Sequence, residues 1–286
     1  ERESPPKTLR GGLSGLLTEE ELQKLTTSFD IVGDIAIVEI PETLEGNEKK
    51  IGEALLKVHK NVRTVLKKLG GMEGEYRVRR FACIAGDDRT ETVYMESGVK
   101  MRLDLAKVYF SPRLAHERGR IAEIVKDGER VLVLFAGVGP FALVIAKQKP
   151  KSKVAAVELN PDAVRYMREN IALNKLKNVE ALEADAGALD FGAIGGAGSF
   201  DRVIMPLPKS AHEFLVIAFA ALRDGGTVHF YTIVGMGEPF AEALGKAETE
   251  AKKCGFSLQV LSQRIVRPYS PSQVQVVLDL RVIRKM

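Results

Sequence analysis

Cysteine and tryptophan are scarce in this sequence of 286 residues, which has two cysteines, Cys83 and Cys254, and no tryptophan. The cysteines have neither metal-site nor redox spacing, so we expect no disulfide framework and no metal site, and a reducing, cytoplasmic setting is favoured. No apolar run approaches the roughly 20 residues that a membrane helix needs. The charged first ten residues, with Pro5 and Pro6, are not typical of a signal peptide. We therefore expect neither secretion nor membrane insertion.

A large excess of one sign of charge is also missing. The 42 basic and 38 acidic residues give a formal net charge of +4. This balance permits binding to nucleic acid without requiring it. Hydrophobic residues make up 45% of the chain, which is enough for a buried core.

The first part of the chain predicts a small α+β domain over residues 1–107. Residues 29–40 read as two strands that turn at Gly33 and Asp34, and residues 48–69 have the apolar spacing of a helix that ends at Gly70 and Gly71. Strands are predicted over 76–85, 92–95 and 99–103. The basic residues of the predicted helix favour a solvated face, with phosphate contact as the alternative: Lys57, Lys60, Arg63, Lys67 and Lys68.

Residues 108–286 alternate between predicted helices and predicted strands. This order is typical of an α/β domain with a doubly wound, mostly parallel sheet, as in Rossmann-like folds. Helices are predicted over 113–125, 140–147, 161–174, 211–222 and 239–254, and strands over 130–135, 153–158, 179–182, 202–205, 227–233 and 274–282.

A glycine-containing segment between a predicted strand and a predicted helix indicates a cofactor site. Such glycines let the backbone approach a ligand and present the amides of the helix N-terminus. Glu158 ends the next strand and can accept ribose hydroxyls, while Asp185 follows the third strand and can accept an adenine amino group. The predicted cofactor-binding residues of the segment are Phe135, Gly137, Gly139, Pro140 and Phe141.

Three interpretations of this segment remain open. A tight turn without a ligand and a nicotinamide site are the alternatives. The proline in the GVGPF loop, and Asn160 and Pro161 directly after the acid, favour S-adenosylmethionine. The sequence therefore predicts an S-adenosylmethionine-dependent methyltransferase.

The order of several longer motifs resembles one family, the archaeal and eukaryotic tRNA guanine-37 N1-methyltransferases with their wyosine-pathway relatives. The resemblance is clear over about 75–286 and weaker towards the N-terminus. It implies a class I methyltransferase domain, residues 108–286, preceded by a small domain that helps to seat the tRNA. The motifs that carry it are YFSPRLAHERGRI (109–121), LFAGVGPFAL (134–143), VELNPDAVRYMRENIALNKL (157–176), DRVIMPLPKSAHEF (201–214) and VHFYTI (228–233).

The resemblance implies roles for three residues. Glu117 takes the position of a general base for guanine N1, Arg77 the position that faces guanine O6, and Tyr109 a position that closes the cofactor and guanine pocket. From the residues alone, Glu117 could instead be a surface helix acid paired with Arg113 or Arg120. Arg77 could be a solvated strand arginine, and Arg79 and Arg80 are close enough in sequence to blur the assignment.

The motif that holds the target base in this family departs from the usual pattern. Guanine-specific members usually carry asparagine before Leu-Pro, whereas Pro206 precedes Leu207 and Pro208 here. Proline has neither an amide side chain nor a backbone donor, so one hydrogen bond to the base is lost. Some archaeal relatives methylate C7 of the wyosine intermediate imG2, and a changed base pocket is consistent with that activity.

The resemblance also implies a substrate and two alternatives. We expect the anticodon stem-loop of tRNA as the partner, no protein partner and a monomer. One alternative is a wyosine-pathway aminocarboxypropyl transferase, which the Leu-Pro motif disfavours. The other is a non-catalytic RNA-binding protein that retains the cofactor fold. Members of the family often carry a further N-terminal domain. The segment before Phe29 is too short to hold one, so we expect either a short form of the protein or a truncated chain.

Overall fold

The computed structural model describes residues 6–284. The chain divides into two units, one of Glu1–Glu96 with Lys100–Pro112 and one of Ser97–Val99 with Arg113–Met286. In the described part of the chain, no helix combines the length and apolar composition needed to cross a membrane.

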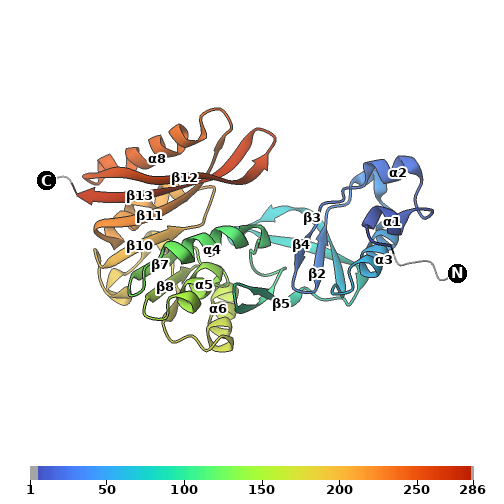
Figure 1. Ribbon diagram of the computed structural model, residues 1–286, viewed down its shortest axis with the longest axis horizontal. Helices are drawn as coiled ribbons and strands as arrows, with labels where there is room; N and C mark the ends of the chain where they lie inside the picture. Colours follow the sequence, from blue (N-terminus) through green and yellow to red (C-terminus); the bar gives the residue numbers. More distant parts are fainter. Residues whose placement is uncertain (1–5, 285–286) are drawn as a thin grey trace. The chain divides into compact units, whose positions relative to one another are not determined.

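The first unit contains a four-stranded sheet in the order β1-β2-β3-β4 (Figure 1). The predicted turn at Gly33 and Asp34 is confirmed, because it joins antiparallel strands β1 and β2. Helix α3 connects β2 to the parallel strand β3, and buried leucines of α1 and α2 join the core beneath it. A separate hairpin, β5-β6, completes the unit. The bounds are α1 (Leu9–Leu13), α2 (Glu19–Lys24), β1 (Asp30–Val32), β2 (Ile35–Val38), α3 (Glu48–Val58), β3 (Thr64–Glu73), β4 (Val78–Gly86), β5 (Glu91–Glu96) and β6 (Val99–Asp104).

The helix predicted over 48–69 is wrong in its second half. Helix α3 ends at Val58, and β3 begins at Thr64 and continues through Gly70 and Gly71. The first three residues of β3 are all buried, so the strand lacks the alternation that marks a half-buried strand, and its apolar residues fit helical spacing by coincidence. The single basic helix face therefore does not exist.

Two of the five basic residues assigned to that face lie on β3 instead. Lys67 forms ion pairs with Glu45 and Glu48, and Lys68 lies 3.5 Å from Glu39. These two lysines pair with acids of their own unit.

The second unit is built on a seven-stranded sheet in the order β12-β13-β11-β10-β7-β8-β9 (Figure 1). The five strands from β11 to β9 run parallel to one another, and β13 is antiparallel to both of its neighbours, β11 and β12. The predicted α/β fold with a mostly parallel sheet is thus confirmed. The bounds are β7 (Arg130–Leu134), β8 (Lys153–Glu158), β9 (Val179–Glu183), β10 (Phe200–Met205), β11 (Leu222–Gly235), β12 (Phe256–Ser270) and β13 (Gln273–Arg284).

Strand β12 is missing from the prediction. It is an edge strand with three register shifts against β13, and most of its residues are exposed or half-buried. Each bulge breaks the period of two on which a strand prediction depends. The sequence pattern was therefore too irregular to indicate it.

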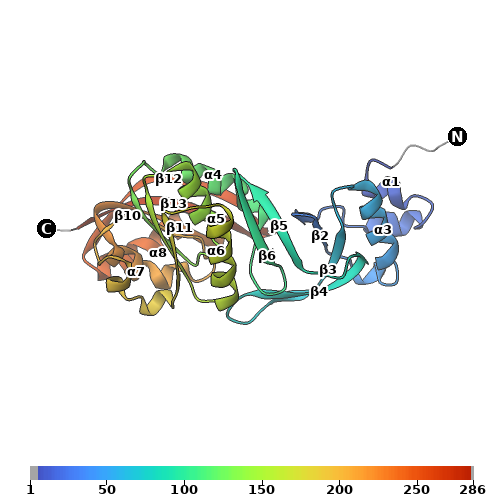
Figure 2. The same cartoon turned by 90° about the horizontal axis from the view of Figure 1, so that it is seen from below.

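Helices pack on both faces of this sheet. Figure 2 shows α5 and α6 to one side of the strands and α7 to the other. Sheet residues such as Leu134, Val203 and Phe230 share a core with alanines of α7 and α8. The two predicted helices over 113–125 and 211–222 each begin with a 3-10 turn, η2 (Pro112–Leu114) and η5 (Ala211–Phe214). The helix bounds are α4 (Ala115–Ile124), α5 (Pro140–Gln148), α6 (Pro161–Leu173), α7 (Leu215–Ala221) and α8 (Pro239–Lys253).

A single asparagine secures the connections behind the cofactor segment. The side-chain amide of Asn178 donates to the carbonyls of Ala146, Lys149 and Ser152 at 3.1–3.2 Å. We expect Asn178→Ala to lower the free energy of unfolding by about 2 kcal/mol, because it leaves partly buried carbonyls without a donor. Chemical denaturation would measure this change. The exposed Asn61→Ala is the control, with an expected change within about 0.5 kcal/mol, and equal effects of the two variants would contradict the assignment.

Candidate functional site

The segment after β7 has an unusual backbone. Phe135 has a φ of 54°, Gly137 of 58° and Gly139 of 89°, so three residues of this short turn lie in the left-handed region. Gly139 caps the N-terminus of α5 and Pro140 is its first residue. A Cβ atom on Gly139 would lie 2.9 Å from Cγ of Met167, so the backbone is closely packed there. The turn thereby presents the amides of the N-terminus of α5.

Glu158, at the end of β8, holds this turn directly. Its Oε2 accepts a hydrogen bond from the backbone N–H of Gly137 at 2.7 Å. Its Oε1 accepts from the N–H groups of Leu159 and Asn160, each at 2.9 Å. The structure therefore brings the predicted acid and the predicted glycine turn together.

Two further predicted residues lie near the ends of neighbouring strands. Asp185 follows β9 and its Oδ1 accepts from the N–H of Gly187 at 2.8 Å. The ring of Phe135 packs edge-on against Phe214 of η5, with 4.9 Å between the centroids. The predicted turn, Glu158 and Asp185 thus lie at the carboxyl ends of β7, β8 and β9, which are adjacent in the sheet.

These groups fit the parts of S-adenosylmethionine in order. Helix N-terminal amides suit its carboxylate, the carboxylate at the end of the second strand suits ribose hydroxyls, and the acid after the third suits an adenine amino group. Ligands in open parallel sheets bind at this edge, beyond the carboxyl ends of the strands. In the described part of the chain, no three His, Cys, Asp or Glu residues are placed to hold a metal ion.

Glu117 is buried rather than at the surface. Its side chain on α4 is 6% exposed. Oε1 accepts hydrogen bonds from Nε of Arg120 at 2.9 Å, from Nη2 of Arg120 at 2.5 Å and from the hydroxyl of Tyr231 at 2.7 Å. Within residues 6–284, every hydrogen bond to this carboxylate ends on Oε1. The open alternative, a pair with Arg120, is therefore present, but it is a buried pair.

Phe141 connects the turn at residues 135–139, which we call the cofactor turn, to Glu117. Its side chain is buried and its ring lies 5.9 Å from the ring of Tyr231, on β11. Burial, together with the neighbouring negative charge of Glu117, raises the pKa of Tyr231 well above its usual value. Tyr231 thus stays a hydrogen-bond donor to Glu117. The ring of Phe141 packs against Tyr231, and its backbone N–H is one of the amides at the N-terminus of α5.

Arg77 and Tyr109 lie together in the first unit. The guanidinium carbon of Arg77 is 5.6 Å from the centroid of the Tyr109 ring. Arg77 has a φ of 53°, which is uncommon for a residue other than glycine and marks a constrained position. Neighbouring Arg80 is exposed and its Nη2 lies 2.8 Å from Glu73. Of these two arginines, Arg77 is the one held against a predicted site residue.

The Pro-Leu-Pro segment continues from the end of β10. Pro206 is half-buried and Pro208 is buried. The carbonyl of Pro208 accepts a hydrogen bond from the N–H of Ile233, at 3.0 Å. This bond ties the segment to β11, the strand that also carries Tyr231.

Sequence reasoning missed the partners that surround Glu117. The predicted strands contain Tyr231, His229 and Asp279, but the sequence assigns them no role. Arg120 is predicted only as a surface partner of Glu117. Asp279 is 4% exposed in the middle of β13. An aspartate flanked by Leu278 and Leu280 was the one available signal, because a charged residue inside an apolar strand needs a partner.

Comparison with known proteins identifies the family. Residues 92–260 match a family model described as the TRM5/TYW2 methyltransferase domain, and residues 9–90 match one described as the TYW2 N-terminal domain. The tRNA (guanine(37)-N(1))-methyltransferase Trm5b of Pyrococcus abyssi is 46% identical over 264 residues, which cover 92% of this chain and 77% of that protein. A solved complex of aTrm5 with tRNALeu has a TM-score of 0.84 at 35% identity and covers 96% of this chain and 78% of that one.

A second kind of relative also matches. The tRNA(Phe) (4-demethylwyosine(37)-C(7)) aminocarboxypropyltransferase of Pyrococcus horikoshii is 33% identical over 276 residues, 96% of each chain.

The fold and the cofactor turn define a class I methyltransferase that uses S-adenosylmethionine. The chain belongs to the TRM5/TYW2 methyltransferase family, and the resemblance inferred from its motifs is thereby confirmed.

Replacement of Glu158 tests the cofactor site. We expect Glu158→Ala to weaken binding of S-adenosylmethionine by at least about tenfold, because it removes a carboxylate that also holds the N–H of Gly137. Isothermal titration calorimetry would measure the affinity. Asp162→Ala, an exposed acid in the first turn of the helix that follows, is the control. An unchanged affinity in Glu158→Ala would contradict the site.

Proposed function

We propose that this protein transfers the methyl group of S-adenosylmethionine to N1 of guanosine 37 in the anticodon loop of tRNA. In this proposal residues 1–107 help to seat the tRNA and residues 108–286 carry the transfer. The likeness to Trm5b over 92% of the chain supports the substrate. The observation that supports the chemistry most directly is the buried Glu117 carboxylate, which the described residues hold through Oε1. Monomeric state and cytoplasmic location stay predictions.

Glu117 is proposed as the general base. Methylation at N1 requires loss of the N1 proton, and a carboxylate oxygen within hydrogen-bond reach can take it. Because Arg120 and Tyr231 both donate to Oε1, Oε2 is the oxygen that remains to accept this proton. When bound, S-adenosylmethionine supplies an electrophilic methyl group on its sulfonium sulfur. The new N1–methyl bond replaces the N1–H bond, and S-adenosylhomocysteine is the by-product.

Arg77 and Tyr109 are proposed to act on the base. Negative charge grows on guanine O6 as N1 loses its proton, and the guanidinium of Arg77 stabilises it. The ring of Tyr109, 5.6 Å from that guanidinium carbon, holds Arg77 in place and closes the pocket. Pro206 and Pro208 shape the wall that faces the base.

C7 of a tricyclic wyosine precursor is the second candidate target. The names of two relatives, Taw21 of Saccharolobus solfataricus and Taw22 of Nanoarchaeum equitans, identify this precursor as 4-demethylwyosine rather than imG2. Pro206 stands where guanine-specific members usually have asparagine, so the wall of the base pocket lacks one amide. The first unit also matches the TYW2 N-terminal domain model. A tricyclic base offers a different set of edge groups, and a wall without the amide is compatible with it.

The two targets are separated by one assay. Two tRNAs with identical anticodon stems, one with guanosine at position 37 and one with 4-demethylwyosine, are incubated with labelled S-adenosylmethionine, and the nucleosides are identified by mass spectrometry. We expect 1-methylguanosine from the first tRNA. Methylation of the 4-demethylwyosine tRNA alone would show that the second candidate, and not guanosine 37, is the target. Transfer of an aminocarboxypropyl group, or no transfer at all, would contradict the proposal.

Replacement of Glu117 tests the base. We expect Glu117→Gln to lower the single-turnover rate of methyl transfer by about a hundredfold or more, while the affinities for tRNA and S-adenosylmethionine stay near those of the wild type. Quench-flow with saturating enzyme would measure the rate. A rate within a few fold of the wild type would remove Glu117 from this role.

Replacement of Arg77 tests the assignment to O6. We expect Arg77→Ala to slow methyl transfer by about tenfold or more, because charge on O6 loses its partner. The exposed neighbour Arg80→Ala is the matched control and should keep the wild-type single-turnover rate. If Arg80→Ala slowed transfer and Arg77→Ala did not, the register of the assignment would be wrong.

A further inference from the structure

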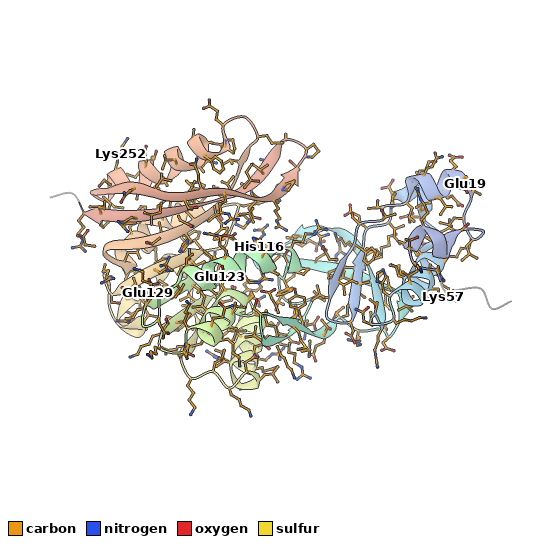
Figure 3. The ribbon with its side chains drawn as sticks, viewed as in Figure 1. Glu19, Lys57, His116, Glu123, Glu129 and Lys252 are labelled. Atoms are coloured by element: carbon orange, nitrogen blue, oxygen red, sulfur yellow. The ribbon has the colours of Figure 1, made fainter. Side chains whose placement is uncertain are left out.

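Glu117 is one end of a buried chain of ionic side chains in the second unit. We define the buried ion chain as Glu117, Arg120, Asp279, His229, Arg202 and Glu129, in the order of their contacts. It runs from α4 through β13, β11 and β10 to the residue before β7. Figure 3 labels His116 and Glu123 on α4 and Glu129 at the far end of the chain. Each side chain in it is at most 13% exposed.

Arg120 bridges two carboxylates with its planar fork. Its Nε and Nη2 donate to Oε1 of Glu117, while Nη1 and Nη2 donate to Oδ2 and Oδ1 of Asp279 at 2.6 and 3.2 Å. The two bonds to Asp279 fix the plane of the guanidinium. Asp279 therefore sets the direction from which Arg120 donates to Glu117, although it lies 159 residues after Arg120 in the sequence.

Asp279 is itself held on its other side by His229. Nδ1 of His229 lies 2.6 Å from Oδ1 of Asp279, and Nε2 lies 2.7 Å from Nη1 of Arg202. A guanidinium can only donate, so Nε2 accepts and the proton of the neutral ring is on Nδ1, where it donates to Asp279. Burial lowers the pKa of His229 below its usual value, in keeping with the neutral form.

The charges along the chain are consistent with this arrangement. Burial alone would raise the pKa of Asp279, but hydrogen bonds from His229 and Arg120 hold it well below its usual range. Burial alone would lower the pKa of Arg120, but its bonds to Asp279 and Glu117 raise it. Arg120 thus stays a cation between two anions.

We propose that Asp279, acting through Arg120, is a positioning residue for Glu117: it holds Oε1 in place and so turns Oε2 towards the target base. This inference rests on the proposed role of Glu117 as the base. Tyr231 fixes the same oxygen from β11. Near-attack geometry depends on such supports, and small misplacements of a catalytic group lower rates strongly.

The test separates positioning from a merely structural contribution. We measure the single-turnover rate with saturating tRNA and S-adenosylmethionine, and both affinities, for Asp279→Asn, Glu117→Gln and the double variant. Asp279→Asn should lower the rate about tenfold or more and leave both affinities within about twofold. In the Glu117→Gln background it should cause no further loss, because the group that it positions is gone.

Glu129→Gln is the matched control. It removes the charge of a buried carboxylate that pairs with Arg202 at the opposite end of the buried ion chain. Neutral His229 lies between this pair and Asp279. Its rate should stay within about twofold of the wild type. If Asp279→Asn fails to fold, Arg120→Lys carries the same test, since lysine keeps the charge but loses the fork that bridges both acids.

Three results would overturn the inference. The first is a wild-type rate in folded Asp279→Asn or Arg120→Lys enzyme while Glu117→Gln is slow. This result would reject the positioning role and leave Glu117 as the proposed base. The second is that Asp279→Asn lowers the rate by the same factor in the wild-type enzyme and in the Glu117→Gln enzyme. A wild-type rate in Glu117→Gln would remove the base and the positioning residue together. Because the identity of the methylated nucleoside is measured on the wild-type enzyme, failure of the proposed target is recorded separately.

Discussion

The ion pair between Arg120 and Asp279 is the interaction on which the catalytic unit depends most. Buried charges are tolerated only when each finds a partner, and Arg120 satisfies two acids at once. One of these acids comes from α4 and the other from β13. The pair between Arg120 and Asp279 therefore joins the helix that precedes the sheet in the sequence to the last strand in the sequence. Loss of Arg120 would leave two buried carboxylates without the cation that they share.

The same region links the cofactor turn to the proposed base. The N–H of Gly137 is held by Glu158, and Phe141, four residues later, packs against Tyr231, whose hydroxyl donates to Glu117. Cofactor turn and base are thus separated by two aromatic rings. In this account, catalysis is set by where one carboxylate oxygen points, and the cofactor turn and β11 help to fix it.

Local patterns in the sequence predicted the parallel sheet, the glycine turn and Glu158, because the strand, turn, helix and acid follow each other within about 30 residues. They failed where a pattern was ambiguous or non-local. The fully buried start of β3 has no alternation, and β12 is broken by bulges. Asp279 meets Arg120 across 159 residues, so no spacing rule could pair them. The proposed role of Glu117 rests on family resemblance, since an acid three residues before an arginine is common on exposed helices.

The most direct test of this account is the structure of the enzyme with S-adenosylhomocysteine and an anticodon stem-loop that carries guanosine 37. We predict that Oε2 of Glu117 lies within about 2.6–3.2 Å of guanine N1, while Arg120 and Tyr231 still donate to Oε1. A guanine N1 that faces another acceptor, or a Glu117 carboxylate that reaches the base only after it has released Arg120, would contradict the account.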